Sequence, residues 1–128
     1  MTIETTVLVT DDGFAPAPPA ARAVATLGPA DDPATLADRL DTLDLIRVEF
    51  PKFSDGRGFT HARALRRMGY AGRLHAVGHV IADQYAMARR SGFDAVEIDA
   101  DLARRQPEDQ WRARADWRAH DYQSRLRG

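Results

Sequence analysis

Two hydrophobic periodicities, one typical of strands and one typical of helices, alternate along this chain. Short runs that are apolar, or that alternate apolar and polar residues, predict strands, and they lie at residues 23–27, 45–50, 74–78 and 95–99. Stretches with apolar residues three or four positions apart predict helices, and they fill the intervals at residues 33–43, 60–67 and 80–91. Because single helices between strands imply right-handed crossovers, the pattern predicts an α/β fold of about four βα units with a mainly parallel sheet.

The ends of these helices carry recognisable signals. Residues 31–33, Asp-Asp-Pro, supply an N-cap and a first-turn proline for the helix at 33–43. The sequence Arg-Arg-x-Gly-aromatic occurs at residues 66–70 and again at 89–93, each time just before a strand. A glycine after the last helical turn takes the left-handed conformation, and the aromatic residue that follows packs back on that turn. Both copies therefore predict a helix end of the same kind.

Polar residues occupy alternate positions in the last three predicted strands and, in one case, the position directly before a strand. They are Arg47, Glu49, Arg73, His75, Glu97 and Asp99. A parallel sheet covered by helices on both faces is apolar on both faces, so this sheet is expected to have one apolar and one polar strand face. Such a sheet suits a two-layer fold with one open, solvated face. It also suits a half-barrel-like arrangement, that is, half of a (βα) barrel whose interior is completed by a partner or by a second copy in a homodimer.

One domain is expected for the whole chain, residues 1–128, since its length and its composition, 44% hydrophobic and 29% charged, suit a single core. Residues 1–22 are interpreted as a short strand or hairpin followed by a proline-rich connection. Residues 106–128 are interpreted as a C-terminal helical arm, because Pro107 and two acidic residues open it as they open many helices. The arm carries both tryptophans, and it either docks on the core or binds a partner.

Composition excludes several classes of function. The formal net charge is −1 and the pI about 6.4, so no overall field attracts nucleic acid or a membrane surface. The absence of cysteine excludes disulfides, thiolate metal sites, iron–sulfur ligation and cysteine nucleophiles. No Gly-x-Gly-x-x-Gly fingerprint is present, so no dinucleotide cofactor is expected. Without a signal-like start or an apolar stretch of about 20 residues, the protein is expected in the cytoplasm.

The carboxyl ends of three predicted parallel strands are expected to meet at one edge of the sheet, where α/β proteins collect ligands. They carry the segments 50–58, 78–84 and 97–99. In the first segment, FPKFSDGRG, glycines free backbone N–H groups and an arginine offers a fork to an oxyanion beside a helix start. The residues predicted to bind an anionic ligand are Lys52, Asp55, Gly56, Arg57, Gly58, Asp83 and Gln84.

These residues have distinct expected roles. Lys52 and Arg57 contact the anion, Asp55 holds Arg57, and Asp83 and Gln84 contribute from the neighbouring loop. Sulfite, sulfate or phosphate is then expected to raise the melting temperature of the wild type but not that of Arg57→Ala. The alternative interpretation is that the glycines form a turn and a tight helix entry, and that Arg57 is a solvated side chain paired with Asp55.

Acid–base chemistry has three candidates, Glu49, Asp55 and His61. His61 is expected in the exposed first turn of a helix. His75 and His79 have the four-residue spacing of a helical metal pair, but they straddle the end of a predicted strand. No metal site is therefore expected there.

A resemblance to a known family joins these segments. The residues that carry it are Phe50-Pro51-Lys52-Phe53-x-Asp55-Gly56-Arg57-Gly58-Phe59-Thr60, Leu74-x-Ala76-Val77-Gly78-x-Val80-x-x-Asp83-Gln84 and Arg90-x-Gly92-Phe93-Asp94. Over about residues 43–98 the chain resembles a bacterial family of unknown function whose members are labelled probable oxidoreductases involved in sulfite reduction. The resemblance implies an association with assimilatory sulfate and sulfite reduction.

Three functions follow as expectations. The first is an accessory protein of sulfite reduction that binds an anionic ligand, or a partner among the sulfite-reduction enzymes, at the edge made by the βα loops. A chain without cysteine cannot itself supply the iron–sulfur chemistry of sulfite reductase. The second is a small enzyme acting on an oxyanion or a phosphorylated substrate through acid–base residues. The third is a purely structural adaptor that docks through the polar sheet face and the C-terminal arm.

Overall fold

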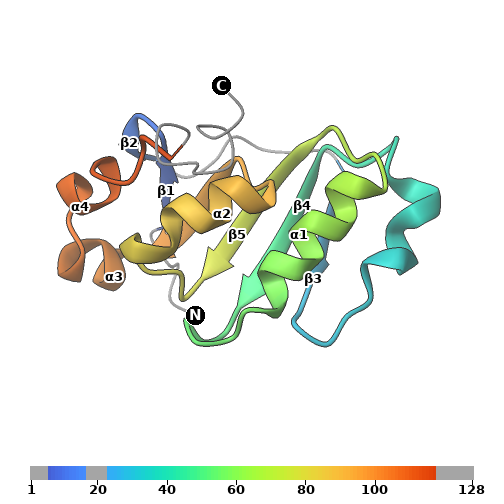
Figure 1. Cartoon of the computed structure of the whole chain (residues 1–128), viewed down its shortest axis with the longest axis horizontal. Coiled ribbons are helices and arrows are strands. Elements are labelled where there is room, and N and C mark those ends of the chain that lie inside the picture. Colours follow the sequence, from blue (N-terminus) through green and yellow to red (C-terminus); the bar gives the residue numbers. More distant parts are fainter. Residues whose placement is uncertain (1–5, 17–22, 118–128) are drawn as a thin grey trace, which may run out of the picture.

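The computed structural model describes residues 6–16 and 23–117, and its strands form one six-stranded sheet (Figure 1). The strand order is β2-β1-β6-β5-β4-β3. The strands are β1 Thr6–Thr10, β2 Gly13–Ala15, β3 Val24–Leu27, β4 Leu45–Phe50, β5 Arg73–Gly78 and β6 Ala95–Asp99. The helical elements are the 3₁₀ helices η1 Pro33–Arg39 and η2 Ala82–Gln84 and the α-helices α1 Arg57–Arg67, α2 Tyr85–Ser91, α3 Ala100–Arg105 and α4 Glu108–Arg112.

The sheet is mostly parallel. Strands β3 to β6 run in one direction, and β1 pairs antiparallel with both β6 and β2. The predicted α/β class, with a mainly parallel sheet, is therefore confirmed. The βα units are less regular than four equal repeats, because the connection from β3 to β4 holds only η1 and the helix expected at residues 80–91 is divided into η2 and α2.

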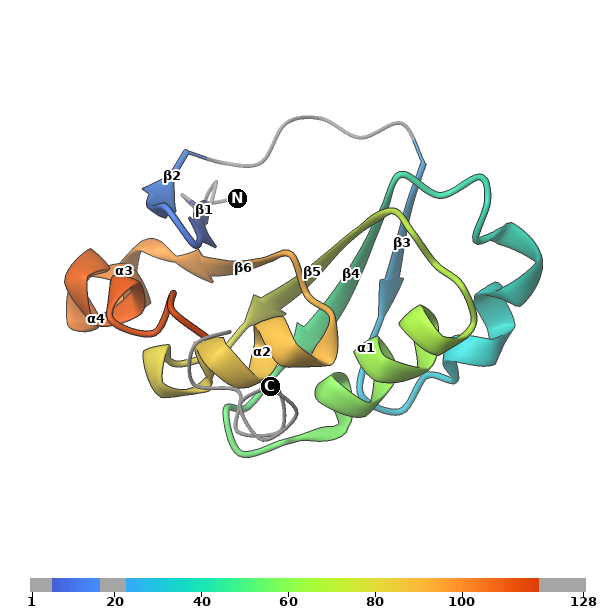
Figure 2. The same ribbon diagram turned by 45° about the horizontal axis from the view of Figure 1, so that its top comes forward.

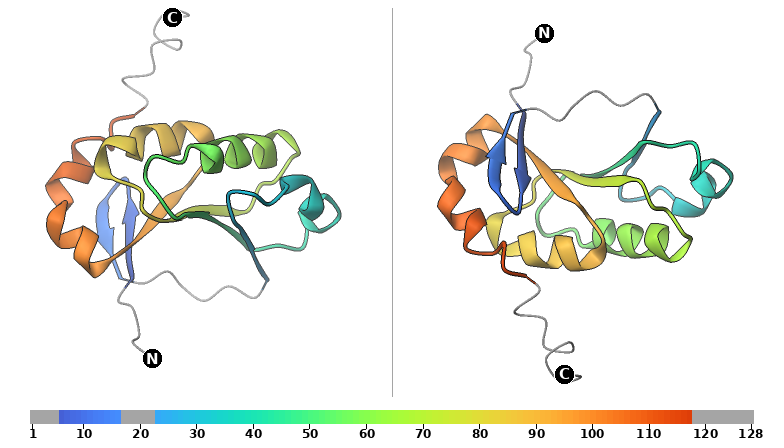
Figure 3. Two further views of the ribbon diagram at one scale, coloured as in Figure 1. Left: turned by 90° about the horizontal axis from the view of Figure 1, so that it is seen from below. Right: turned by 90° about the horizontal axis from the view of Figure 1, so that it is seen from above.

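Helices α1 and α2 lie side by side on one face of the sheet, and the hairpin β1–β2 and the edge strand β3 extend away from them (Figures 2 and 3). The apolar strand positions face these helices. The core residues between sheet and helices are Val9, Ile46, Val48, Phe50, Leu74, Ala76, Val96 and Ile98 from the strands and Phe59, Ala62, Leu65, Tyr85 and Ala88 from α1 and α2. The rings of Phe59 and Phe93 lie 5.0 and 5.8 Å from that of Phe50, centroid to centroid.

The two Arg-Arg-x-Gly-aromatic sequences end α1 and α2 as predicted. Gly69 and Gly92 have φ of 101° and 118°, a conformation that glycine adopts without strain. The buried aromatic residue after each glycine donates its backbone N–H back to the helix, Tyr70 to the carbonyl of Leu65 at 3.0 Å and Phe93 to that of Ala88 at 3.1 Å. Each helix therefore ends where the loop to the next strand begins.

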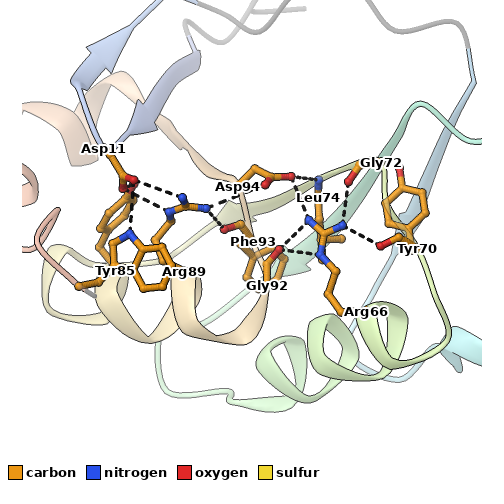
Figure 4. A network of polar contacts seen from close by, with 11 residues as sticks. Asp11, Arg66, Tyr70, Gly72, Leu74, Tyr85, Arg89, Gly92, Phe93 and Asp94 are labelled. Atoms are coloured by element: carbon orange, nitrogen blue, oxygen red, sulfur yellow. Dashed lines mark hydrogen bonds and ion pairs between the residues drawn. The ribbon is translucent and has the colours of Figure 1, made fainter. Parts of the chain in front are cut away.

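The first arginine of each copy also binds the loop that follows it (Figure 4). Arg66 donates to the carbonyl oxygens of Tyr70, Gly72 and Gly92 and to the Asp94 carboxylate, all at 2.8–3.0 Å. Arg89 makes the equivalent bond to the backbone carbonyl of Phe93, at 2.5 Å. It also donates to both oxygens of the Asp11 carboxylate, each at 3.2 Å. These bonds join the loops at the amino edge of β5 and β6, opposite the edge predicted to bind ligand.

Helix α1 begins three residues before the predicted start at residue 60. The Asp55 carboxylate accepts the backbone N–H of Arg57 at 3.1 Å, which satisfies a donor at the new start. At the other end of the helix, the C-cap residue Met68 is 38% exposed, because the chain leaves the helix there. The expected N-cap of the preceding element is present, since Asp32 accepts from Ala34 N at 2.9 Å, although that element is a 3₁₀ helix that ends at Arg39.

The C-terminal segment docks on the core as far as residue 117. The buried Trp111 of α4 packs edge-on against Tyr85, and its indole N–H donates to Gln106 O at 2.9 Å. Trp117 donates to the Asp11 carboxylate at 3.3 Å, and the Arg89 guanidinium lies 4.8 Å from its ring centroid. The rest of the predicted arm, residues 118–128, and parts of the predicted N-terminal segment, residues 1–5 and 17–22, lie outside the described residues.

Candidate functional site

Three segments distant in sequence lie together at the carboxyl edge of β4, β5 and β6. Phe50 O accepts the backbone N–H of His79 at 2.8 Å, and Phe53 O accepts from the Gln84 side chain at 2.6 Å, so the first two loops are bound to each other. The Gln106 side chain accepts the backbone N–H of Ala82 at 2.6 Å, which binds the second loop to the end of α3. The edge predicted to collect ligands is therefore one continuous surface.

A pocket of about 450 Å³ opens among these segments. Its lining residues are Phe53, His79, Ile81, Leu102, Arg105 and Gln106. Phe53 is 56% exposed, which is unusual for a large apolar side chain, and the Arg105 side chain is 67% exposed. The pocket thus combines an apolar wall with an imidazole and a guanidinium, the pattern of a ligand site with a few orienting polar groups.

Arg57 is turned toward its own loop rather than toward this pocket's lining. Its Nε and NH2 groups donate to the Asp55 carboxylate, with a shortest distance of 2.6 Å. Bonds from the Arg57 side chain and backbone lower the pKa of Asp55 to about 2. This is the alternative geometry considered for the segment, an aspartate–glycine turn with a solvated, paired arginine.

The two glycines beside Arg57 have different explanations. Gly58 is buried, and a Cβ there would lie 2.3 Å from Cζ of the Phe50 ring, so close packing requires glycine. Nothing lies within 4 Å of a Cβ at Gly56, and its φ is −84°. Lys52 is exposed on the same loop as Phe53 and forms no ion pair within the described residues.

Asp83 and Gln84 shape the edge but do not line the pocket. Asp83 forms an ion pair with Arg114 of the C-terminal segment. Gln84 accepts the backbone N–H of Ile81 at 3.1 Å while it donates to Phe53. Both side chains hold neighbouring segments in place.

The three acid–base candidates differ in exposure and in their partners. His61 is buried, which contradicts its expected exposure, and its Nε2–H donates to the carbonyls of Gly28 and Pro29 at 3.2 and 3.0 Å. Asp55 is engaged by Arg57 as described above. Glu49 is exposed near the end of β4, and its Oε1 would lie 3.5 Å from a Cβ on Gly28.

A smaller hollow of about 280 Å³ lies beside the main pocket, and His79 lines both. Its lining residues are Glu49, Phe50, Pro51, Val77, Gly78 and His79. Gly78 ends β5 with φ of 116°, and a Cβ there would lie 2.7 Å from Phe50 O. The backbone at this point therefore needs glycine, and that turn places His79 between the two hollows.

The polar sheet face carries an ion cluster in which His75 and Glu97 are buried and the Arg47 side chain is 37% exposed. The Arg47 guanidinium donates twice to the Glu97 carboxylate, at 2.8 and 3.2 Å, and His75 Nδ1 lies 2.8 Å from Glu97 Oε2. Burial opposes ionisation of Glu97, but the bonds from His75 and Arg47 outweigh it, so the pKa of Glu97 lies below its ordinary value. The predicted polar face is present, and its two buried polar residues, His75 and Glu97, are paired with each other.

The pocket residues of α3 were missed because no element was predicted for residues 100–105. A signal was present: Asp99 caps the helix by accepting Leu102 N–H at 2.8 Å, Asp101 follows in the first turn, and two arginines occupy the last turn. The sequence pattern assigned His79 no ligand-binding role, and Phe53 was not among the residues predicted to bind a ligand. In the described part of the chain, no three His, Asp or Glu side chains converge as a metal site needs.

Comparison with known proteins adds the family. Among residues 6–16 and 23–117, every helix is too short or too polar to cross a bilayer. None of the curated proteins and none of the solved structures compared with the chain matches it. The model of a family described as "Bacterial protein of unknown function (DUF934)" matches residues 24–128, which include every residue of the pocket. The chain therefore belongs to this bacterial family of unknown function.

Proposed function

We propose that the protein is an accessory protein of assimilatory sulfate and sulfite reduction that binds an anionic ligand, or a reductase partner, at the carboxyl edge of its sheet. The observation that carries the proposal is the pocket among the three loops, where His79 and Arg105 stand beside Phe53 and Ile81. The residues assigned to ligand contact are accordingly His79 and Arg105, in place of Arg57.

Local charge supports an anion. On α3 a single carboxylate, Asp101, pairs with both Arg104 and Arg105, at 2.8 and 3.0 Å. Two guanidinium groups therefore share one negative charge, and Lys52 adds another positive charge on the facing loop. An arginine whose side chain is 67% exposed keeps donors free for a second acceptor, because its fork has five N–H groups.

The place in sulfur metabolism rests on a different argument. It comes from the resemblance of residues 43–98 to proteins labelled as involved in sulfite reduction, and the cytoplasm is the proposed location. The proposed anion site and the proposed pathway can therefore be refuted independently, and each has its own experiment.

The anion site is tested by thermal unfolding with sulfite, sulfate or phosphate against chloride at equal ionic strength. We expect the oxyanions to raise the melting temperature of the wild type and of Arg57→Ala, since Asp55 already engages Arg57. Arg105→Gln should lose the shift. Arg63→Gln is the matched control, because it removes the same charge from an exposed position on α1 outside the pocket lining. An equal shift in Arg105→Gln and wild type would remove the proposed site.

The pathway is tested by deleting the gene in the bacterium that carries it. Growth on sulfate or sulfite as the sole sulfur source should slow, growth on cysteine should be normal, and the wild-type gene should restore growth where Arg105→Gln does not. Unchanged growth on sulfate would contradict the pathway assignment and leave the anion site standing. A pull-down of sulfite-reduction enzymes with the same variants distinguishes a ligand from a reductase partner.

An acid–base enzyme is the weaker alternative. Asp55, with a pKa of about 2, is a poor proton carrier near neutral pH, and the Nε2–H of His61 is committed to backbone carbonyls. Of the three predicted candidates, Glu49 is the one whose carboxylate is exposed at a hollow.

Static light scattering tests the remaining expectation, a homodimer that covers the polar sheet face.

A further inference from the structure

The size of the pocket and its apolar wall limit what fills it. A sulfite or sulfate ion has four or five heavy atoms, and even at the ~30 Å³ share of a water molecule for each atom it occupies about 150 Å³ at most. The pocket measures about 450 Å³. An inorganic oxyanion bound to the two basic groups would leave most of this volume to water.

The apolar residues come from all three segments. Phe53 lies on the loop after β4, Ile81 on the loop after β5, and Leu102 on α3. Leu102 is buried, but Phe53 is 56% exposed and so presents a large apolar surface to solvent. Such a surface beside polar groups is typical of a site that an apolar body covers.

The position of Phe53 is held by the backbone and not by side-chain burial. Its carbonyl accepts the Gln84 amide at 2.6 Å, and Gln84 is held in turn by Ile81 N–H at 3.1 Å. The aromatic side chain is thus presented on a bonded loop while its own surface stays open. A flat ring stacked on it would bury apolar area on both partners.

We propose that the ligand is an organic anion: a flat, apolar body that stacks on Phe53 and contacts Ile81 and Leu102, with one sulfonate, phosphate or carboxylate group on His79 and Arg105. This inference rests on the proposed anion site and specifies the substrate class it takes. Gln106, which also lines the pocket, is already bonded through its Oε1 to Ala82 N–H.

The experiment is isothermal titration calorimetry at constant ionic strength with two probes, naphthalene-1-sulfonate and sulfate. We expect the wild type to bind the naphthalenesulfonate at least tenfold more tightly than sulfate. Phe53→Ala should reduce this preference to less than threefold. Met87→Ala is the matched control, since Met87 is also an exposed large apolar residue, 48% accessible, and does not line the pocket. Arg105→Gln should weaken both probes, and Arg63→Gln neither.

The outcomes separate this inference from the function on which it rests. Sulfate binding as tight as the naphthalenesulfonate, with no effect of Phe53→Ala, would overturn the organic ligand and leave the anion site. Binding of neither probe would overturn both. Neutral naphthalene-1-methanol binding as tightly as the sulfonate would show that charge has no part, and would overturn the anion site as well. Because Phe53 and Arg105 are exposed, their variants are expected to fold, and their melting temperatures without ligand check this.

Discussion

At the residue scale, the close packing around Phe50 explains why two neighbouring positions hold glycine. Its ring lies between those of Phe59 and Phe93, and Gly58 and Gly78 stand where a Cβ would meet its ring or its carbonyl. Glycine in the motif FPKFSDGRGFT is therefore required in part by packing.

Gly58→Ala should destabilise the protein by about 1–3 kcal/mol, although alanine favours helices, because the buried Phe50 ring has no free space to move into. Gly56→Ala should cost no more than about 1 kcal/mol, since a Cβ there meets nothing within 4 Å. Urea unfolding of both variants measures the difference. Equal losses would show that Phe50 does not constrain this position.

Glu97 links pH to stability. Its pKa in the folded protein lies below the ordinary 4.5, so its stabilisation is fully present above that pH and is lost as the pH falls through the lower folded value. Glu97→Gln should be less stable than wild type by about 3 kcal/mol at pH 7, because it breaks a buried pair, and the gap should narrow toward pH 3.

Chemical unfolding from pH 7 to pH 3 checks this expectation. Glu49→Gln is the control, because Glu49 lies on the same strand face as Arg47 but is exposed and outside the cluster. Parallel stability curves for Glu97→Gln and wild type would contradict the account of the ion cluster.

At the scale of elements, Arg66 joins α1 to the amino edge of β5 and β6 (Figure 4). Arg66→Ala should lower the unfolding free energy by about 2–3 kcal/mol, since several partly buried carbonyls lose their donor. Arg67→Ala, the exposed neighbour in the same helix, should change stability by less than about 0.5 kcal/mol. Thermal and urea unfolding measure both, and similar losses would show that this network adds no stability.

Elements with a strong local signal were predictable. Strands β4 and β6 have the predicted bounds, and both Arg-Arg-x-Gly-aromatic helix ends formed as expected, because alternation and a glycine stop are local properties. Helix α3 was missed although its cap signal was present, because it follows β6 without a loop. The start of α1 was placed too late because the bond that fixes it comes from Asp55, before the hydrophobic pattern begins.

At the scale of the whole molecule, topology predicted which segments meet at one edge of the sheet, and local motif chemistry did not predict how their side chains pair. The carboxyl ends of parallel strands meet whatever the side chains are, so the edge could be predicted. The pairing of Arg57 with Asp55, two residues away, was considered as an alternative. Arg105 joins the pocket because the end of α3 is bonded to the loop after β5, and the buried His61 donates to carbonyls 32 and 33 residues away, which no local pattern reveals.

The central claim is that an anion binds among these three loops, and amide chemical-shift mapping during a titration with sulfite tests it most directly. We predict that the largest shifts fall on residues 52–54, 79–82 and 102–106, and that they are lost in Arg105→Gln and kept in Arg63→Gln. Largest shifts at residues 55–58, or at the amino edge around Arg66 and Asp94, would contradict it.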